Sequence, residues 1–593
     1  MLNKFINKII MIKAFTKLIF CGSLIFIIAC RSEIQDKSPE SIRGLKLNIN
    51  IDNFNETDIN KQSTVKTESG NTNNINRQEF RSGVFDVISE LSSDNLIAKK
   101  ISLISPKSFL SKNIVFCIIA YDTQSGDYLA HDYGSTSNPD KILFSNFNLV
   151  GNKKYTFVTY SLNNSSLRQV VPTTNLNTAK LDLFQLNGDE SGTDLLYAIN
   201  ENILLSGGNT SIDVTLKHQF SRISISIDTG DAVGILGQPD YIKGGYPLKN
   251  NMTGGFTGII PDFYTSLRFN LKNATVTEGL KEGLQVKKIS TSETKFIINT
   301  GKNADYKSKL IIPTGAVVIG KDINKAPINI AINGPNNTGL QSGKSYTLKL
   351  KFNSDRYTDN SGVTTSKTFG KYAVIAGYRW ARFNLGVINS NPAVYNPDIP
   401  RKEIHGAKYH WGAYSGENGR YYSQQQDQDN PSVIPEWSIT PLPEKSWNSG
   451  TESNPIRTSR DPCSALDSGG LYYRIPTATE YKESFKYTSS EQIGFPATNP
   501  NITTHFEYAI TMRSKKSKNI ALTFPAAGTR IYQLPYWFGH LIRRGIAADY
   551  WTSTEAIYVQ HPMSYIVQIE TDGSPKGNSY LKATGFPVRC IQD

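Results

Sequence analysis

Apolar and polar residues alternate along much of the chain with the period of β-strands. In residues 44–52 every second position is Leu or Ile, and the positions between them carry Lys or Asn. Because successive side chains of a strand point to opposite faces, this segment predicts a half-buried strand. Residues 53–82, which follow, are rich in Asn, Thr, Ser and Lys and predict a linker or an exposed loop.

Short strand patterns recur from residue 83 to residue 353, bounded by Gly, Asn and Asp. The clearest are residues 212–216 and 221–227, which both alternate with period two but in offset registers, as a bulge or bend between them would produce. A later pattern spans residues 343–352. Little in this region has the length of an amphipathic helix, so the spacing predicts β-sandwiches, the first at 83–228 and the second at 229–353.

The chain changes character after residue 353. Residues 354–368 are polar and predict a linker, and all six tryptophans lie beyond them. We therefore expect a separate domain at 369–593 in which aromatic side chains supply much of the burial, with Trp380, Trp411 and Trp551 in its core. Thr477 and Glu480 have the spacing of a capping box and predict a short helix that begins there.

Composition narrows the class of protein. Of the 593 residues, 38% are apolar, 19% are charged and 11% are aromatic. The aromatic content excludes a disordered chain, and the overall amino-acid composition excludes a collagen, a coiled coil and a polytopic membrane protein. The formal charge is +13, but the basic residues are scattered and form no Arg-rich run, so we expect no nucleic-acid partner.

The first 30 residues have the pattern of a signal peptide. They carry lysines at 4, 8, 13 and 17, no acidic residue, and a 12-residue apolar run that ends at Cys30. A helix of that length spans about 18 Å, too short for a bilayer core of about 30 Å. Residues 1–29 are therefore predicted to be a removable signal peptide.

The sequence Phe-Ile-Ile-Ala-Cys at 26–30 resembles the lipobox of bacterial lipoproteins. The resemblance implies that a signal peptidase cuts before Cys30 and that this cysteine carries the acyl chains that anchor the mature chain to the cell outer membrane. An ordinary secretory signal with a coincidental cysteine is the alternative. Residues 30–82 would then hold the lipid tether, the first strand and a cleavable loop.

Export would place the remaining cysteines in a compartment where a disulfide persists. Cys117 lies in the apolar run 114–119, which predicts a buried strand in which the thiol acts as a small core residue. Cys463 and Cys590 remain as the natural pair.

Three segments resemble the fimbrillin-like lipoproteins of Bacteroidota. They are Thr-Asp-Leu-Leu-Tyr-Ala at 193–198, Leu-Lys-His-Gln-Phe-Ser-Arg-Ile at 216–223 and the Gly-Lys-Ser-Tyr strand at 343–352. The resemblance covers about 44–353 and implies two tandem β-sandwiches, a place in a surface fimbria (pilus) or its accessory set, and other fimbrial subunits as partners. We expect His218 to be a hydrogen-bonded structural residue.

The same resemblance implies proteolytic processing. In fimbrillin-like proteins an Arg-specific protease cuts after a first strand, and a strand of another subunit fills the groove that opens. Arg77 and Arg81 follow the first strand in this sequence, so the mature subunit would begin at Gln78 or Ser82. Cutting at Arg43 would leave the strand in place. The alternative is that the segment stays attached as a tether.

Seven motifs in the last region resemble the Fibrobacter succinogenes major paralogous domain, a relative of the C-type lectin-like and formylglycine-generating-enzyme folds. They lie at 379–386, 409–412, 461–463, 473–477, 524–528, 550–555 and 588–590. The resemblance implies an α+β C-type lectin-like domain at 369–593, in which Cys463 and Cys590 are paired. The predicted fold class is therefore mainly β, with two sandwiches followed by this domain.

Catalytic motifs are absent from the sequence. It has no Gly-x-Ser-x-Gly, His-Glu-x-x-His, phosphate loop or Cys-x-x-Cys, and His405 and His410 are spaced poorly for a metal pair. The calcium motifs of C-type lectins are missing, and both cysteines that a formylglycine-generating enzyme would need are committed to a bridge. We expect no catalytic residue, no metal and no cofactor. An enzyme on the formylglycine-type scaffold is the less favoured alternative.

Residues 413–460 are the best candidate for a binding surface. They hold Tyr421, Tyr422, Trp437 and Trp447, and aromatic side chains suit sugar faces and protein epitopes. The alternative is an insertion whose aromatic residues pack onto the domain. Together these features predict a lipidated, surface-exposed fimbrial accessory or tip subunit whose lectin-like domain recognises a host protein or glycan. A surface glycan-capture lipoprotein that never polymerises is the runner-up.

Overall fold

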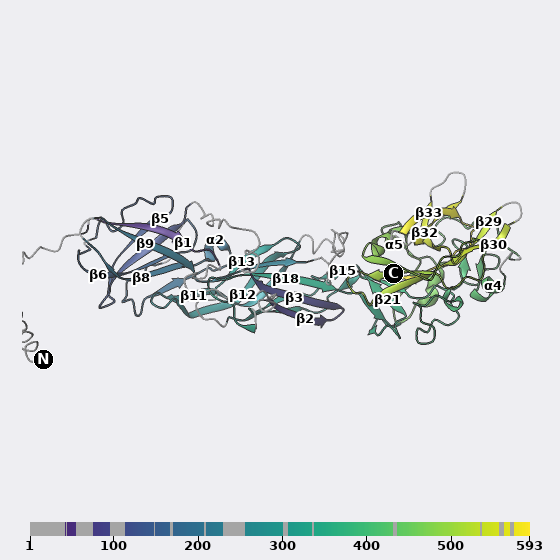
Figure 1. The fold of residues 1–593 in the computed structure, drawn as a ribbon, viewed down its shortest axis with the longest axis horizontal. Coiled ribbons are helices and arrows are strands. Elements are labelled where there is room, and N and C mark those ends of the chain that lie inside the picture. The colour runs from purple at the N-terminus through teal and green to yellow at the C-terminus, as the bar shows by residue number, and fades with distance from the viewer. Residues whose placement is uncertain are drawn as a thin grey trace, which may run out of the picture.

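A computed structural model of the chain describes residues 42, 44–54, 75–94, 113–147, 149–165, 170–206, 209–228, 255–299, 306–334, 337–430, 434, 436–533, 537–556, 562–569 and 575–593. The described part is mainly β, as the sequence predicts. Two β-sandwiches and a rounder C-terminal domain follow one another along the long axis of the molecule (Figure 1).

The first sandwich is built on a six-stranded sheet. In spatial order its strands are β1 (Gly44–Ile51), β9 (Asn209–His218), β8 (Leu196–Leu204), β6 (Lys154–Ser161), β4 (Val115–Asp122) and β5 (Tyr128–Ser135). The first predicted strand is therefore present, and it lies at the edge of this sheet beside a strand that comes over 150 residues later.

Both faces of this sheet are covered. In β4, Phe116 and Ile118 pack into one apolar cluster, while Cys117 and Ile119 pack into another on the opposite face. Burial on both faces explains why this strand reads as a continuous apolar run and not as an alternation. Cys117 is fully buried with a free thiol, and burial raises its pKa to about 12.

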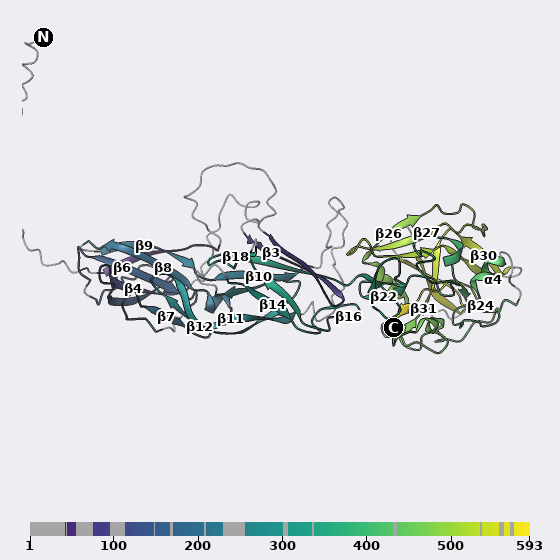
Figure 2. The same cartoon turned by 90° about the horizontal axis from the view of Figure 1, so that it is seen from below.

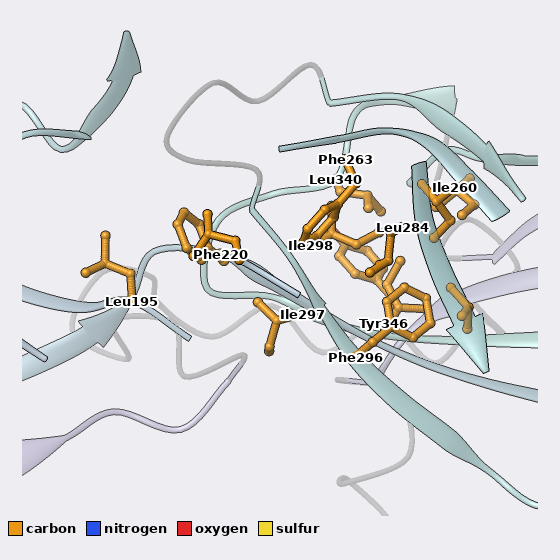
Figure 3. Packing of buried hydrophobic residues seen from close by; sticks show 14 of the residues in the cluster. Leu195, Phe220, Ile260, Phe263, Leu284, Phe296, Ile297, Ile298, Leu340 and Tyr346 are labelled. Atoms are coloured by element: carbon orange, nitrogen blue, oxygen red, sulfur yellow. The ribbon is translucent and has the colours of Figure 1, made fainter. Parts of the chain in front are cut away.

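Two facing sheets form the second sandwich. One contains β13 (Thr294–Ile298), β10 (Ser221–Ile227), β18 (Ser345–Asn353), β3 (Phe85–Ser93) and β2 (Ile75–Ser82). The other contains β12 (Thr275–Ile289), β11 (Phe256–Asn270), β14 (Ser308–Ile312) and β17 (Ile328–Ile332), with β7 (Lys180–Leu183) paired to β11. Figure 3 shows Phe263, Leu284, Phe296 and Tyr346 packed together in the core.

The predicted boundary between residues 228 and 229 does not match the division of the sheets. β3 and β10 were expected in the first sandwich but lie in the second, because β18 pairs with both of them. β7 also comes from the segment expected in the first sandwich, but it pairs with Leu267 and Phe269 of β11. The two sandwiches share one continuous apolar cluster.

The predicted loop at 53–82 ends sooner than expected. Its last eight residues form β2, which pairs antiparallel with β3 along its whole length. The side-chain amide of Gln78 also bonds to the backbone of Ala331 in β17, donating to its oxygen at 2.8 Å and accepting from its nitrogen at 3.2 Å. This polar strand was missed because its side chains are mostly half-exposed and show no apolar alternation.

The C-terminal domain is assembled from small sheets joined by long loops. Its largest sheet runs β20 (Thr364–Thr365), β19 (Arg356–Thr358), β21 (Tyr372–Ile375), β22 (Tyr378–Ala381), β34 (Ile591–Gln592) and β25 (Tyr473–Arg474). The others are β23 (Lys408–Tyr409) with β24 (Tyr421–Tyr422), β26 (Thr488–Ile493) with β27 (Ala509–Ser514) and β28 (Ala521–Pro525), β29 (Ala527–Gln533) with β30 (Trp537–Arg544), and β31 (Ala548–Ala556) with β32 (Met563–Ile569) and β33 (Pro575–Leu581).

Short helices complete the architecture. They are α2 (Glu190–Thr193), η5 (Lys402–Ile404), α4 (Gln424–Asp429), η6 (Pro462–Leu466) and α5 (Ala478–Phe485). The predicted capping box is present at α5, where Thr477 accepts from the Glu480 backbone and the Glu480 carboxylate accepts from the Thr477 backbone. Trp380, Trp411 and Trp551 are fully buried, as predicted.

The predicted linker at 354–368 is a folded part of the C-terminal domain. β19 and β20 lie within it, and Tyr357 is buried with its hydroxyl accepting from the Ala521 backbone at 3.0 Å. Arg356 forms a two-pronged ion pair with Asp322 of β16 (Asp322–Ile323), which pairs with β15 (Val318–Ile319) at the end of the second sandwich. Figure 2 shows this junction between the second sandwich and the C-terminal domain.

Candidate functional site: a removable strand and a crosslinked domain

The N-terminal strand β1 closes the edge of the first sandwich. It runs parallel to β9 in an unbroken register from Gly44 opposite Asn209 to Ile51 opposite Leu216. On its other side, Leu45 and Leu143 exchange backbone hydrogen bonds of 2.9 and 2.8 Å. β1 therefore bridges between β9 and the loop that follows β5.

The inward side chains of β1 seal an apolar core. Leu45 is fully buried and Leu47 is 7% exposed, and both belong to a cluster with Phe116 and Leu143. A cavity of about 140 Å³ remains beneath Leu47 and Ile49. Removing β1 would expose this apolar surface and leave β9 with an unpaired edge, which is the arrangement that accepts an added strand.

The outward side chains of β1 are polar. Asn48 donates to Asp213 at 2.8 Å and to Ser211 at 3.1 Å, both on β9. Because these side-chain contacts are exposed, they stabilise the strand less than the buried Leu45 and Leu47 and the backbone ladder with β9 do.

His218, at the end of β9, is a hydrogen-bonded residue, as expected. Its Nδ1 lies 3.0 Å from both carboxylate oxygens of Asp194, which also accepts from Asn163 at 2.9 Å. The pair is nearly buried, with side chains 8% and 2% exposed. It lies where the first sandwich passes into the second.

Arg77 and Arg81 lie within β2 and not in a loop. Arg77 pairs with Glu90 of β3 at 2.9 Å, and Arg81 donates to Thr364 of the C-terminal domain at 2.9 Å. Their side chains are about half exposed, but the peptide bonds beside them belong to a paired strand. A protease that binds an extended substrate reaches these bonds only after β2 separates from β3. Cys30 lies outside the described residues.

Cys463 and Cys590 form a disulfide, with a Cα–Cα distance of 5.7 Å. This is the pair that the motifs implied. Both cysteines are fully buried beside Tyr473 and Trp551. Asp461 begins η6 by accepting from the Cys463 backbone at 2.9 Å, and it also accepts from the Ile475 backbone at 2.9 Å. Burial raises the pKa of Asp461 to about 7.

Three of the four aromatic side chains predicted to bind a ligand are buried. Trp447 is fully buried against Trp411, and its Nε1 donates to the Ala413 backbone at 3.0 Å. Tyr422 stacks on Trp437 with ring centroids 5.0 Å apart, and both are less than a tenth exposed. These three side chains form no exposed binding surface in this structure, because each fills the interior of a loop-rich domain that has few aliphatic runs.

Tyr421 is the least buried of the four. It is half-buried, and its ring packs on Tyr409 with centroids 5.1 Å apart. Exposed apolar side chains in the predicted surface segment are instead Tyr414, Ile439 and Ile456, each about half exposed. No local sequence pattern distinguishes these exposed residues from the buried aromatic residues around them.

A buried group of charges lies near α4. The carboxylate of Asp427 pairs with Lys408 at 3.3 Å and also with Arg530 and Arg544. All four side chains are at most 1% exposed. Burial opposes ionisation of Asp427, but the three cations outweigh it and hold the pKa of that carboxyl below its usual range. Burial lowers the pKa of Lys408 to about 8.

His405 and His410 are buried separately. His405 contacts the Phe506 backbone oxygen at 3.3 Å, and burial holds its pKa well below the usual value. His410 packs on Trp437, and burial lowers its pKa to about 3. Within the part of the chain that the structure describes, no group of three or more His, Cys, Asp or Glu could hold a metal ion. The same residues include no helix with the length and hydropathy needed to cross a bilayer.

No protein-family model matches this sequence, and no curated protein matches it. Three of the similar solved structures come from Bacteroidota. The tip fimbrial protein Mfa3 of Porphyromonas gingivalis is 8% identical, with 41% of this chain and 94% of that chain covered and a TM-score of 0.25. A candidate polysaccharide-binding protein of Bacteroides thetaiotaomicron is 11% identical, with coverages of 46% and 91% and a TM-score of 0.26.

The third is a candidate cell adhesion protein of Bacteroides ovatus. It is 11% identical, with 53% of this chain and 93% of that chain covered and a TM-score of 0.27. With TM-scores below 0.5, these resemblances assign neither a family nor a function to the chain.

Proposed function

We propose that this chain is the lipid-anchored precursor of a surface fimbrial accessory or tip subunit that assembles by β-strand exchange. The observation that carries the proposal is the position of β1. It is an edge strand whose apolar side chains seal the first sandwich, and it is also the first strand among the residues that the structure describes. One cut after β1 and before β3 therefore separates β1 from the rest of the folded chain.

Assembly would follow from that cut. Cys30 anchors the precursor to the cell outer membrane, and an Arg-specific protease cuts at Arg77 or Arg81. β1 then leaves with the lipid-bearing piece. A strand from a neighbouring subunit takes its place along β9, with main-chain hydrogen bonds for affinity and alternate side chains in the positions of Leu45 and Leu47.

The choice of cut affects β2. Cutting after Arg77 leaves Gln78 on the mature chain, where its amide pairs with Ala331. Cutting after Arg81 removes that amide and also leaves the edge of β3 without β2. Either cut needs β2 to separate from β3 first, so we expect processing to be slow on the folded precursor.

The C-terminal domain would supply recognition. It lies at the far end of the molecule from β1 (Figure 1), so a chain joined to a fimbria through the first sandwich would present this domain outward. We propose that it is a non-catalytic, lectin-like domain that recognises a host protein or glycan without calcium, through exposed loop residues and not through the buried Tyr422, Trp437 and Trp447.

Electrophoresis of unheated material sheared from cells tests assembly. A fimbrial subunit gives a ladder of high-mass species, whereas a glycan-capture lipoprotein that does not polymerise gives a monomer. The double variant Arg77→Ala, Arg81→Ala should abolish the ladder, because it removes both proposed cut sites while breaking only exposed ion pairs and the exposed hydrogen bond from Arg81 to Thr364, which have small energetic value.

Arg268→Ala is the matched control. It also removes an exposed, ion-paired arginine from a strand of the sandwiches, and the ladder should persist. A monomer in the wild-type lane would contradict the proposed assembly. A ladder in the double variant would contradict these two cut sites.

A further inference from the structure

An aromatic ring fixes the end of β1. The ring of Phe54 stacks on the imidazole of His218, with centroids 3.7 Å apart and planes inclined by 17°. The guanidinium of Arg222 lies 4.6 Å from the centre of the same ring. His218 ends β9 and Arg222 belongs to β10, so Phe54 rests on the joint between these two strands.

The residues beneath the ring are held by contacts that do not involve Phe54. His218 is oriented by Asp194, and Arg222 donates to Ser345 at 3.1 Å while lying 3.7 Å from Glu190. Asp194 is the sole buried charged side chain among the described residues before position 355. Burying a carboxylate is costly unless it is paired, and here the pairing orients the imidazole whose flat face stacks on Phe54.

We propose that His218, Asp194 and Arg222 form an anchoring site for an aromatic side chain at the end of an inserted strand. A strand that replaces β1 would then be selected for a planar ring three residues after its last paired residue, where Phe54 follows Ile51. This inference rests on the strand exchange proposed above, and it defines the chemistry of the partner segment.

The anchoring site solves a problem of register. Residues 45–51 repeat an aliphatic residue at every second position, so a shift of two residues along β9 would still place aliphatic side chains inward. The ladder alone therefore specifies the face of the strand but not its position. A ring that stacks on His218 and contacts Arg222 would set the position as well.

Strand replacement on the full chain tests the inference. A recognition sequence for a site-specific protease is inserted between Phe54 and Ile75, and the folded protein is cut, so that β1 stays bound without a covalent link. A fluorescent peptide of residues 44–54 then replaces it, and the release of bound labelled peptide into excess unlabelled peptide is followed by anisotropy. Substitutions are made only in the peptide, so the folding of the protein is unaffected.

The peptides separate stacking from apolar burial. Phe54→Leu keeps an apolar side chain but loses the planar ring, and it should be released about tenfold faster, since stacking and cation–π contacts are lost. Phe54→Tyr keeps the ring and should be released within about twofold of the wild-type rate. Asn50→Ala, at an exposed position of β1, is the matched control and should leave the rate unchanged.

Two results would overturn the inference in distinguishable ways. If Phe54→Leu and wild-type peptides are released at the same rate, strand exchange stands but the anchoring site does not exist. If no wild-type peptide ever enters the groove, strand exchange itself is contradicted, and the anchoring site with it.

Discussion

The sandwiches and the C-terminal domain bury different kinds of side chain. Among the described residues, the sandwiches bury one charged side chain, Asp194. The C-terminal domain buries many, among them Arg356, Arg379, Arg382, Arg474, Arg530, Arg544 and Arg589. Several of these arginines donate to backbone carbonyl oxygens; Arg589, for example, reaches Ala381 at 3.0 Å and Thr523 at 2.8 Å.

The difference follows from the backbone. In the sandwiches, strand ladders satisfy the carbonyl groups, so the interior needs few charged donors, and its buried polar side chains are nearly all uncharged. In the C-terminal domain long loops leave carbonyl groups inside, and a guanidinium with five donors can satisfy several at once. The first kind of core depends mainly on the alternation of apolar side chains, whereas the second depends on particular hydrogen-bond partners.

Loss of the disulfide should give the largest effect. The bond between Cys463 and Cys590 spans 127 residues of sequence, and in the chain-entropy model removing it costs about 5 kcal/mol. Calorimetry of the full chain with and without reductant should show a lower melting temperature for the C-terminal transition alone. Cys117→Ala is the control and should move only the transition of the sandwiches. Two free thiols titrated at these positions in the folded, non-reduced protein would contradict the crosslink.

Asp427→Asn should cause the second largest loss of stability. It leaves Lys408, Arg530 and Arg544 buried without their shared carboxylate, and breaking a buried ion pair in this way costs about 3–5 kcal/mol. Denaturant unfolding should show the loss in the C-terminal transition. Asp194→Asn, the corresponding change in the sandwiches, removes the charge that His218 and Asn163 contact and should cost about 1–3 kcal/mol. A larger loss of stability for Asp194→Asn than for Asp427→Asn would contradict the difference between the two regions.

Acid should weaken the C-terminal domain. The pKa of His410 is about 3 when folded and 6.5 when unfolded, so below pH 6.5 the unfolded state binds a proton that the folded state does not. The contribution of His410 to the free energy of unfolding is therefore fully present above pH 6.5, and it falls by about 1.4 kcal/mol per pH unit toward pH 3. His405 acts in the same direction.

Asp461 acts in the opposite direction. Its pKa is raised from 3.8 to about 7, so between these values the folded state holds a proton that the unfolded state has lost, and acid favours folding. Two histidines outweigh one carboxyl, and the net stability falls on acidification below pH 6.5. His410→Phe should reduce the pH slope of the C-terminal transition by one proton. An unchanged slope in that variant would contradict the buried neutral histidine.

Arg268→Ala should have the smallest effect. Arg268 pairs with Asp182 at 3.0 Å and Glu278 at 3.1 Å on the exposed surface of the sandwiches, and exposed pairs contribute little. Its melting temperature should match that of the wild type. Arg589→Leu, which removes a buried arginine that satisfies backbone carbonyls, should lower the C-terminal transition clearly. Equal effects of the two variants would erase the distinction between the regions.

The local sequence pattern was sufficient to predict individual strands and one helix. The alternation at 44–52 predicts β1, the offset alternations at 212–216 and 221–227 predict β9 and β10 with a bend between them, and the Thr477–Glu480 spacing predicts α5. Each of these signals depends on residues that are only a few positions apart, which is the range over which side-chain periodicity and capping act.

Pairing over long separations could not be predicted from that pattern. β18 pairs with β3 so that Phe352 lies opposite Val87, and nothing in either segment identifies the other. This pairing is why the expected boundary at 228 fails. The same limit hid the cluster around Asp427, because its three cations come from distant positions with no shared motif.

The candidate site was predicted in part. The cysteine pair and the buried tryptophans were expected, but Tyr422, Trp437 and Trp447 were assigned to a binding surface and lie inside the domain. An aromatic residue in a loop has the same local sequence whether it faces solvent or core, so burial has to come from the structure. The stacking of Phe54 on His218 could not be found by periodicity, since the contact joins a residue beyond β1 to the end of a strand distant in sequence.

We expect the assembled protein to lack β1, while its C-terminal domain keeps the disulfide. Determining the N-terminus of protein sheared from cells as assembled fimbriae tests it most directly. We predict that the mature chain begins at Gln78 or Ser82, beyond β1, and that the lipid-bearing piece is absent. Assembled fimbriae whose subunits begin at an acylated Cys30 would contradict the claim.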